Sequence, residues 1–272
     1  STVCESLGVR MGVMRTIGVL GLAGLLLVGV AGCATPPPAS DPDAVAEFKQ
    51  TNDPLEPTNR VMYTVNEGLD TMLIRPLAIG YTWVVPEYVR GRIHNMLSNL
   101  NSPVLLANDM MQGKPRRAGD TLMRFVINST VGLAGIFDVA TDWGYPYHSA
   151  DFGETLALWG VPDGPYLFLP ILGPGNPRDS SGYGVDVALD PMTWVGINNN
   201  TVADIGYARY GLTLLDVRSG LFDTLDKATA QALDPYATVR SLYRQHRAAE
   251  IEAVRQDTRA TPSPWYPTPA NH

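Results

Sequence analysis

Residues 53–73 read DPLEPTNRVMYTVNEGLDTML, and the spacing of their apolar positions is that of an amphipathic helix beginning near Pro57. The polar side of this helix carries Asn59, Tyr63, Asn66 and Asp70. The opposite, apolar side carries Val61, Met62, Val65, Leu69, Met72 and Leu73. Taken alone, a polar stripe on one helix has two interpretations: the wet side of an ordinary surface helix, or one wall of a polar passage.

Prolines are expected to divide the following helical segments. Pro76 and Pro86 are expected to break the first helical run into short pieces. A further helix beginning at Glu87 is expected to be interrupted at Pro103 and to resume over residues 104–111.

A second polar stripe runs along the helix expected from residue 87. It carries His94, Ser98 and Asn101, and it would continue through Asn108 if Pro103 only kinked the helix. Both stripes consist mostly of neutral amides and hydroxyls, whereas a soluble surface helix commonly carries Lys and Glu. Neutral stripes on otherwise apolar helices favour an internal passage. Such a passage would hydrogen-bond a phospholipid head group and so lower its desolvation cost, which is about 2–7 kcal/mol per polar amide.

Residues 120–140, DTLMRFVINSTVGLAGIFDVA, form the most apolar segment of the mature chain. Arg124 and Asn128 lie on one side of the expected helix, and apolar residues cover most of the remaining circumference. A helix of this kind is buried in a core or faces lipid. Arg124 has two interpretations: a contact to a lipid phosphate, or a structural ion pair with Asp120 or Asp138.

The second half of the chain contains a hairpin signal and then returns to helix. Residues 156–170, LALWGVPDGPYLFLP, predict two short strands around the P-D-G turn, followed by an irregular loop rich in Gly and Pro over residues 173–184. Residues 201–255 predict three helical pieces, the last beginning after Asp234-Pro235. The charged residues of this last piece, which indicate a solvated and salt-bridged helix, are Arg240, Arg244, Arg247, Glu250 and Glu252.

The N-terminal residues 1–32 are predicted to be a lipoprotein signal peptide. The uncharged run IGVLGLAGLLLVGVA at residues 17–31 follows two arginines and is shorter than the ~20 residues that a spanning helix needs. Small residues precede Cys33 directly, so Cys33 is the predicted lipid anchor. An ordinary signal peptide with a cysteine near its cleavage site is the alternative.

Residues 33–52 are then the lipidated cysteine and a linker rich in Pro, Ala and Asp. Because Cys4 would be removed with the signal peptide and Cys33 would carry lipid, the mature chain keeps no thiol for a disulfide. Its stability is therefore expected to come from packing.

Composition and motifs argue against several function classes. The formal net charge is −7, which argues against nucleic acid as a partner. The four histidines form no metal-ligand motif, and no cofactor is predicted. No G-x-S-x-G nucleophile elbow is present, although a triad assembled in space from scattered residues stays open. The sequence therefore predicts a protein that is not an enzyme, with a periplasmic lipid hydrolase as the weaker alternative.

The chain resembles the MlaA/VacJ lipoproteins over residues 53 to about 251. The matching segments are, in order, DPLEPTNRVMYTVNEGLD from Asp53, RPLA from Arg75, NLNSP from Asn99, NDMMQG from Asn108, RFVINSTVGLAGIFDVA from Arg124, DFGETLALWGV from Asp151, GPYLFLP from Gly164, RD at Arg178 and DPY at Asp234. The resemblance implies an all-α, compact ring-like helical domain with one small β-hairpin over residues 53–256. A Pro-rich tail at residues 257–272 would follow it.

The resemblance also implies a function. Such a protein would be a lipid-anchored outer-membrane lipoprotein on the periplasmic face of a Gram-negative envelope, associated with trimeric porins. It would take mislocalised phospholipid from the outer leaflet through an amphipathic channel and pass it to a soluble periplasmic carrier, which maintains lipid asymmetry. The candidate residues of the lipid path are Asn59, Tyr63, Asn66, Asp70, Asn101, Asn108, Arg124 and Asn128.

The sequence departs from the family in one segment, and one alternative function stays open. Residues 63–69 would lie near the channel-gating region of the family, and here Glu67 and Gly68 replace part of an Asn/Phe-rich run that relatives can carry. The alternative function is that of a structural, porin-associated envelope lipoprotein that passes no lipid.

Overall fold

A computed structural model describes residues 51–197 and 199–261, together with residues 37, 38, 40, 41, 45 and 48. Within these residues the secondary structure is helical apart from one two-stranded sheet, which confirms the prediction of an all-α fold with a small hairpin. The signal peptide, the Cys33 anchor and most of the linker and Pro-rich tail lie outside the described residues.

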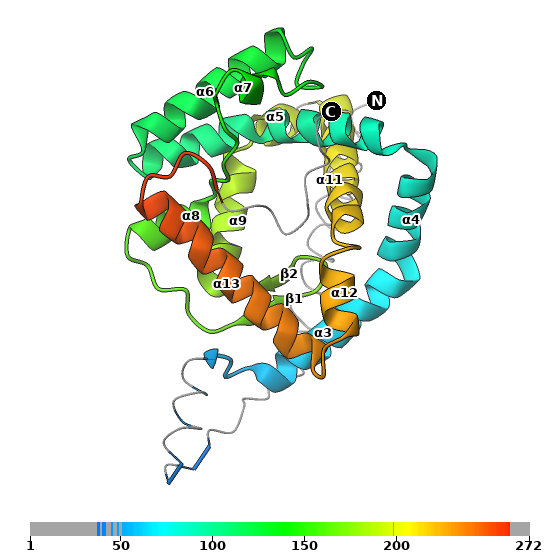
Figure 1. The fold of residues 1–272 in the computed structure, drawn as a ribbon, viewed down its shortest axis with the longest axis vertical. Helices are drawn as coiled ribbons and strands as arrows, with labels where there is room; N and C mark the ends of the chain where they lie inside the picture. The colour runs from blue at the N-terminus through cyan, green and yellow to red at the C-terminus, as the bar shows by residue number, and fades with distance from the viewer. Residues whose placement is uncertain are drawn as a thin grey trace, which may run out of the picture. The chain divides into compact units, whose positions relative to one another are not determined.

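The helices and strands follow one another along the chain as Figure 1 labels them. They are α3 (Glu56–Leu69), the π-helix η1 (Asp70–Ile74), α4 (Arg75–Val84), α5 (Glu87–Met111), α6 (Pro115–Thr130), α7 (Val139–Asp142), α8 (Phe152–Leu158), β1 (Leu167–Leu169), β2 (Gly173–Gly175), α9 (Pro177–Leu189), α10 (Pro191–Ile197), α11 (Asn200–Gly220), α12 (Leu225–Ala230) and α13 (Pro235–Arg255). The three predicted helical pieces of residues 201–255 correspond to α11, α12 and α13.

Two of the expected proline breaks are absent. Pro76 lies in the first turn of α4, where a missing backbone N–H costs no helical hydrogen bond, so α3, η1 and α4 run on without an intervening loop. Pro103 lies inside α5, which is continuous from Glu87 to Met111. A proline inside a helix costs about 3 kcal/mol of stability, because it removes a backbone hydrogen bond and crowds the preceding turn. Burial of Leu97, Val104 and Leu105 offsets this cost in α5. Only Pro86 separates two helices as expected.

The hairpin lies later in the sequence than predicted. Residues 156–158 end α8, and the P-D-G turn at residues 162–164 precedes the first strand. β1 pairs antiparallel with β2 in the register Leu167↔Gly175, Phe168↔Pro174 and Leu169↔Gly173. The expected irregular loop contributes β2 and then α9, because the Asn176 side chain accepts a hydrogen bond from the Asp179 backbone N–H and caps that helix.

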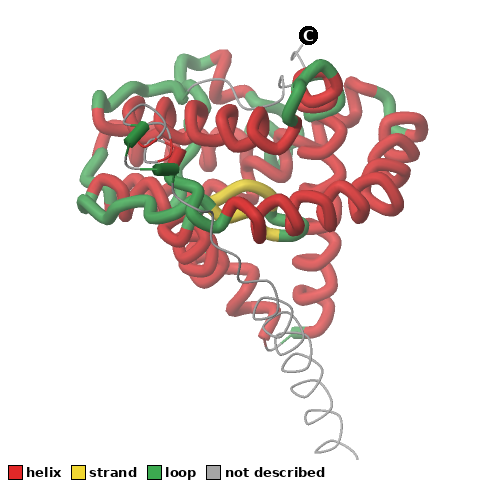
Figure 2. The backbone as a smooth tube through the Cα atoms, turned by 90° about the horizontal axis from the view of Figure 1, so that it is seen from below, coloured by secondary structure: helices red, strands yellow, loops and turns green. Residues whose placement is uncertain are grey.

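The chain divides into two units, residues 1–61 and residues 62–272. In the second unit, α5 packs against α6, α8, α9 and α11, and α13 packs against α8, α12 and β2. An ion pair between Arg75 of α4 and Asp226 of α12 closes a circuit that passes through α4, α5, α8, α13 and α12. The hairpin lies inside this circuit (Figures 1 and 2), which is the ring-like arrangement that was predicted.

Buried and exposed residues are distributed unlike those of a soluble bundle. The apolar cluster of the second unit is small and consists of Met62, Tyr166, Phe168, Tyr236 and Val239. Among the side chains buried most completely are Arg117, His148, Glu154, Asn108 and Asp109. Large apolar side chains are instead exposed along α4 and α6 and in the turns after α6; they include Leu77, Ile79, Trp83, Val84, Leu122, Phe125, Val126, Val131, Leu133 and Phe137. An apolar outer surface of this extent favours a lipid or protein partner.

Within the part of the chain that the structure describes, no helix is both long enough and apolar enough to cross a bilayer.

Candidate functional site

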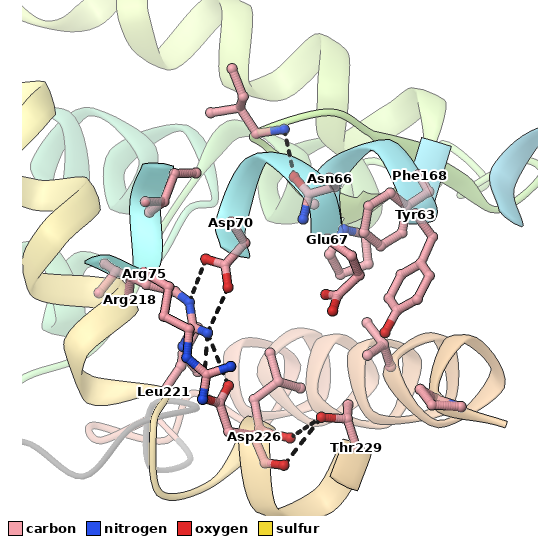
Figure 3. Close-up of a pocket in the computed structure, with 18 of the residues that line it drawn as sticks. Tyr63, Asn66, Glu67, Asp70, Arg75, Phe168, Arg218, Leu221, Asp226 and Thr229 are labelled. Carbon is pink, nitrogen blue, oxygen red and sulfur yellow. Dashed lines mark hydrogen bonds and ion pairs between the residues drawn. The ribbon is translucent and has the colours of Figure 1, made fainter. Parts of the chain in front are cut away.

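A pocket of about 470 Å³ lies within the second unit, between α3 and η1 on one side and α11, α12 and α13 on the other, with the hairpin as a further wall (Figure 3). Its charged and polar lining residues are Tyr63, Asn66, Glu67, Asp70, Arg75, Arg218, Asp226 and Thr229. Its apolar lining residues include Ile74, Phe168, Leu172, Leu214, Val217, Leu221, Leu225 and Val239. The volume is within the range of about 300–1,000 Å³ that is typical of small-molecule sites.

Three residues of the first polar stripe meet in this pocket. Tyr63, Asn66 and Asp70 are three or four residues apart on α3 and η1, so helical periodicity directs all three to the same side. The Tyr63 ring contacts Phe168 edge-on, with centroids 5.4 Å apart, and burial raises the pKa of its hydroxyl to about 12. The Asn66 Oδ1 accepts a hydrogen bond from the Ile171 backbone N–H at 2.8 Å.

That hydrogen bond reaches the tip of the hairpin. Ile171 has φ +71°, a left-handed conformation that a β-branched residue adopts only under constraint. Asn66 on α3 therefore fixes a strained turn in the hairpin wall of the pocket.

Four charged residues form one network that joins η1 and α4 to α11 and α12 across the pocket. Arg218 binds Asp70 in a bidentate ion pair, with Nε–Oδ1 at 2.7 Å and Nη2–Oδ2 at 2.8 Å. Arg218 also contacts Asp226 Oδ1 at 3.0 Å, and Arg75 contacts Asp226 Oδ2 at 3.1 Å. Two arginines and two aspartates balance one another, so this network contributes no net charge to the pocket.

Glu67 is the fifth charged residue of the lining. It lies between Tyr63 and Asp70 on the pocket side of α3, and its carboxylate points into the pocket (Figure 3). Burial, and after it the neighbouring Asp70 carboxylate, raise the pKa of Glu67 above its ordinary value. A positive charge beside Glu67 would favour the ionised carboxylate and so lower its pKa again.

A second cavity of about 390 Å³ shares the hairpin residues Leu172, Gly173 and Pro174 with the pocket. Its charged lining residues are Asp151, Asp179, Asp186, His246, Arg247 and Glu250. Burial raises the pKa of Asp186 to about 6, although the side chain accepts hydrogen bonds from Asn108 and from the Phe152 backbone. Both cavities thus carry more carboxylates than cationic side chains.

Arg247 corrects the interpretation of α13 as a solvated helix. Its side chain is only 11% exposed and lies among four carboxylates. Its shortest contacts are to Asp151 at 2.7 Å and to Asp179 at 3.0 Å. Arg247 thus holds α13 to α8 and α9, which sequence periodicity could not indicate because those partners are distant in the chain.

Most of the other residues predicted for the lipid path lie in polar networks away from this pocket. Asn108 is fully buried and hydrogen-bonds Asp186 and Thr155. Arg124 pairs with Asp138 at 2.9 Å, which is one of the two interpretations that the sequence left open. Asn128 is bonded to the Asp138 side chain and the Ala140 backbone, and Asn101 of α5 does not line the pocket.

Asn59 belongs to the first unit, where its Nδ2 donates to Asp53 Oδ1 at 2.8 Å. Sequence reasoning did not select Arg75, Arg218 or Asp226 as members of the site. Only Arg75 gave a signal, as a charged residue within an otherwise apolar stretch, and the partners of Arg75 and Arg218 are distant in the chain. Among the described residues, no group of three or more His, Cys, Asp or Glu side chains could hold a metal ion.

Comparisons with known proteins agree with one another. The family model described as MlaA lipoprotein matches residues 51–250. A solved structure from work on the structural basis for maintenance of bacterial outer membrane lipid asymmetry matches with a TM-score of 0.63 and 31% identity. That match covers 73% of this chain and 98% of the solved chain.

Curated relatives fall into two groups. An uncharacterized protein of Rickettsia bellii is 33% identical over 205 residues, which cover 75% of this chain and 78% of the relative. The intermembrane phospholipid transport system lipoprotein MlaA of Escherichia coli K12 is 30% identical over 233 residues, covering 84% and 86% of the two chains. Its namesake in Haemophilus influenzae is 32% identical over 243 residues, covering 86% and 90%. The protein therefore belongs to the MlaA lipoprotein family.

Proposed function

We propose that the protein is an outer-membrane lipoprotein that removes mislocalised phospholipid from the outer leaflet and passes it to a soluble periplasmic carrier. The pocket between α3 and α11–α13 is the lipid path in this proposal, and transfer is passive and non-enzymatic. The chain is held by acyl groups on Cys33 at the periplasmic face of the membrane, and trimeric porins are its partners there. The names of the Escherichia coli and Haemophilus influenzae relatives support the phospholipid substrate.

The observation that carries the proposal is the placement of polar and apolar side chains around α3 and α4. Tyr63, Asn66 and Asp70 line the pocket. Met72 and Leu77, in η1 and α4, are 77% and 53% exposed. In a membrane leaflet this arrangement keeps the outer surface in hydrocarbon and offers hydrogen bonds to a head group inside. The head group then avoids much of its desolvation cost, and no chemical step is needed.

The test fills the pocket without changing its charged residues. Thr229 lines the pocket on α12, whereas Lys227 on the same helix is exposed and lies outside the lining. In cells that express the full lipidated chain, Thr229→Trp should raise the phospholipid content of the outer leaflet, measured by surface labelling of head-group amines. Lys227→Trp, a matched control, should leave it at the wild-type level.

Two further measurements separate the alternatives. If folded Thr229→Trp protein maintained asymmetry as wild type does and still co-purified with porins, the lipid path would be wrong and a porin scaffold would be favoured. Fatty acid released when the purified protein is incubated with phospholipid vesicles would instead contradict the non-enzymatic proposal.

A further inference from the structure

The pocket has a net negative charge that one residue supplies. Asp70, Asp226, Arg75 and Arg218 pair with one another at 2.7–3.1 Å, so their charges cancel within the network. Of the five charged residues in the lining, Glu67 alone is left over. Within the described part of the chain, Glu67 has no hydrogen-bond or ion-pair partner.

Glu67 nevertheless lies within electrostatic range of the whole network. Asp70 and Asp226 raise the pKa of Glu67, whereas Arg218 and Arg75 lower it. A bound ligand that placed a cation near Glu67 and an anion near the arginines would therefore match the charge pattern of the lining.

The arginine side of the pocket can accept such an anion. The Arg75 side chain is 47% exposed, and its one ion-pair partner among the described residues is Asp226. A guanidinium group has five N–H donors, so Arg75 can keep Asp226 and still donate to a phosphate oxygen. On the other side, the ring of Tyr63 lies beside Glu67 and offers an aromatic face that attracts ammonium groups.

We propose that this pocket selects zwitterionic phospholipids, with Glu67 as the residue that receives the head-group ammonium and Arg75 as the residue that faces the phosphate. The inference rests on the proposed lipid path and names the substrate class that this path takes. A phospholipid with a net negative head group would bring an anion into a pocket that is already negative, where the low dielectric strengthens repulsion. The second cavity, across the hairpin, is lined by four carboxylates with Arg247 and His246, and this excess of acidic groups would disfavour the same lipids.

The test compares two lipids in membranes that contain the full lipidated chain. Labelled phosphatidylethanolamine and phosphatidylglycerol are introduced together into the outer leaflet of cells that express wild-type or variant protein, and the loss of each label is followed. Wild type should clear phosphatidylethanolamine at least about threefold faster, because one like-charge contact inside a protein is worth more than the ~0.7 kcal/mol that corresponds to this ratio. Glu67→Gln should bring the ratio close to one, and Glu67→Lys should invert it.

Matched variants test whether the Glu67 carboxylate causes the preference for phosphatidylethanolamine. Glu67→Asp keeps the charge and should keep the preference. Glu252→Gln removes an exposed carboxylate of α13 outside the pocket and should leave the ratio unchanged. Glu67→Asp should unfold near the wild-type denaturant concentration, and Glu67→Gln at that concentration or above it, because burial and the Asp70 charge oppose the Glu67 carboxylate in the folded state.

The outcomes distinguish this inference from the proposal on which it rests. Equal clearance of the two lipids by wild type, or an unchanged ratio in Glu67→Gln, would overturn the selectivity while the lipid path stands. Failure of wild type to clear either lipid would overturn the lipid path and the selectivity together.

Discussion

Arg247 and Asp151 form a bidentate ion pair, with Nη1–Oδ2 and Nη2–Oδ1 both at 2.7 Å, across 96 residues of sequence. The pair joins α13 to the start of α8, and Glu154, which is fully buried, lies 3.3 Å from the same guanidinium. Burial and then the Asp151 charge raise the pKa of Glu154 well above its ordinary value. Arg247 therefore serves several carboxylates at once, of which Glu154 is fully buried and Asp151 is 39% exposed.

We expect Arg247→Met to lower the free energy of unfolding by about 3–5 kcal/mol, the usual loss when one partner of a buried ionic group is removed. Denaturant titration of the protein in detergent measures the change. Arg255→Met, on the same helix, removes a 59% exposed side chain whose nearest carboxylate is 3.9 Å away, and should cost no more than about 1 kcal/mol. A similar loss of unfolding free energy in both variants would show that the ion pairs of Arg247 contribute little to stability.

Gly182 of α9 lies against α8 so closely that a Cβ atom there would overlap the Gly153 backbone nitrogen. We expect Gly182→Ala to destabilise the protein by about 1–3 kcal/mol, as overpacking does in well-packed cores. Gly184→Ala, two residues further along α9, meets nothing within 4 Å and should be neutral or slightly stabilising. Thermal unfolding of the two variants side by side tests the helix contact, and equal midpoints would contradict it.

Because of Asp186, the stability of the folded protein should fall as the pH rises from about 4 to 6. Burial raises its folded-state pKa to about 6, above the ordinary value of 3.8, so the folded state retains a proton that the unfolded state loses between these values. Stability from this residue is therefore present at low pH and is lost as the pH rises towards 6 and above. We expect wild type to gain stability relative to Asp186→Asn when the pH falls from 7 to 4.5. A pH-independent difference in denaturation midpoint would contradict the assignment.

The lipid anchor gives a prediction that depends on sequence alone. If Cys33 is the anchor, Cys33→Ser should abolish incorporation of a fatty-acid analogue and remove the protein from the outer-membrane fraction, because the only other cysteine, Cys4, lies far from the predicted cleavage site. Continued labelling of Cys33→Ser would show that Cys33 is not the anchor.

Local signals predicted those parts of the fold that depend on neighbouring residues. The beginning of α3 near Pro57, the beginning of α13 at Pro235 and the shared side of Tyr63, Asn66 and Asp70 follow from helical periodicity and proline preference. These features need no knowledge of distant contacts, and for that reason the polar stripe led directly to the pocket.

Features that depend on distant partners were predicted poorly. Pro103 remains helical because packing outweighs its local preference, and the hairpin begins after the P-D-G turn because residues 156–158 complete a helix capped by Asp151. Arg218 joins the pocket through Asp70, 148 residues away, and no spacing rule in the sequence connects the two. In the polar stripe of α5, Asn108 bonds Asp186 and does not line the pocket, and a role for it in lipid passage stays a prediction.

The buried polar network of Asp109, Thr121 and His148, with Arg117 beside it, should lower the heat-capacity change of unfolding. Unfolding would transfer many polar groups to water, and the heat capacity of the chain falls with polar exposure and rises with apolar exposure. Many of the large apolar side chains are already exposed in the folded state, so unfolding adds less apolar surface than it does in a soluble domain. Calorimetry should therefore give a heat-capacity increment below the ~12–15 cal/mol/K per residue of soluble domains, and a stability curve that stays nearly flat from the cold to physiological temperature.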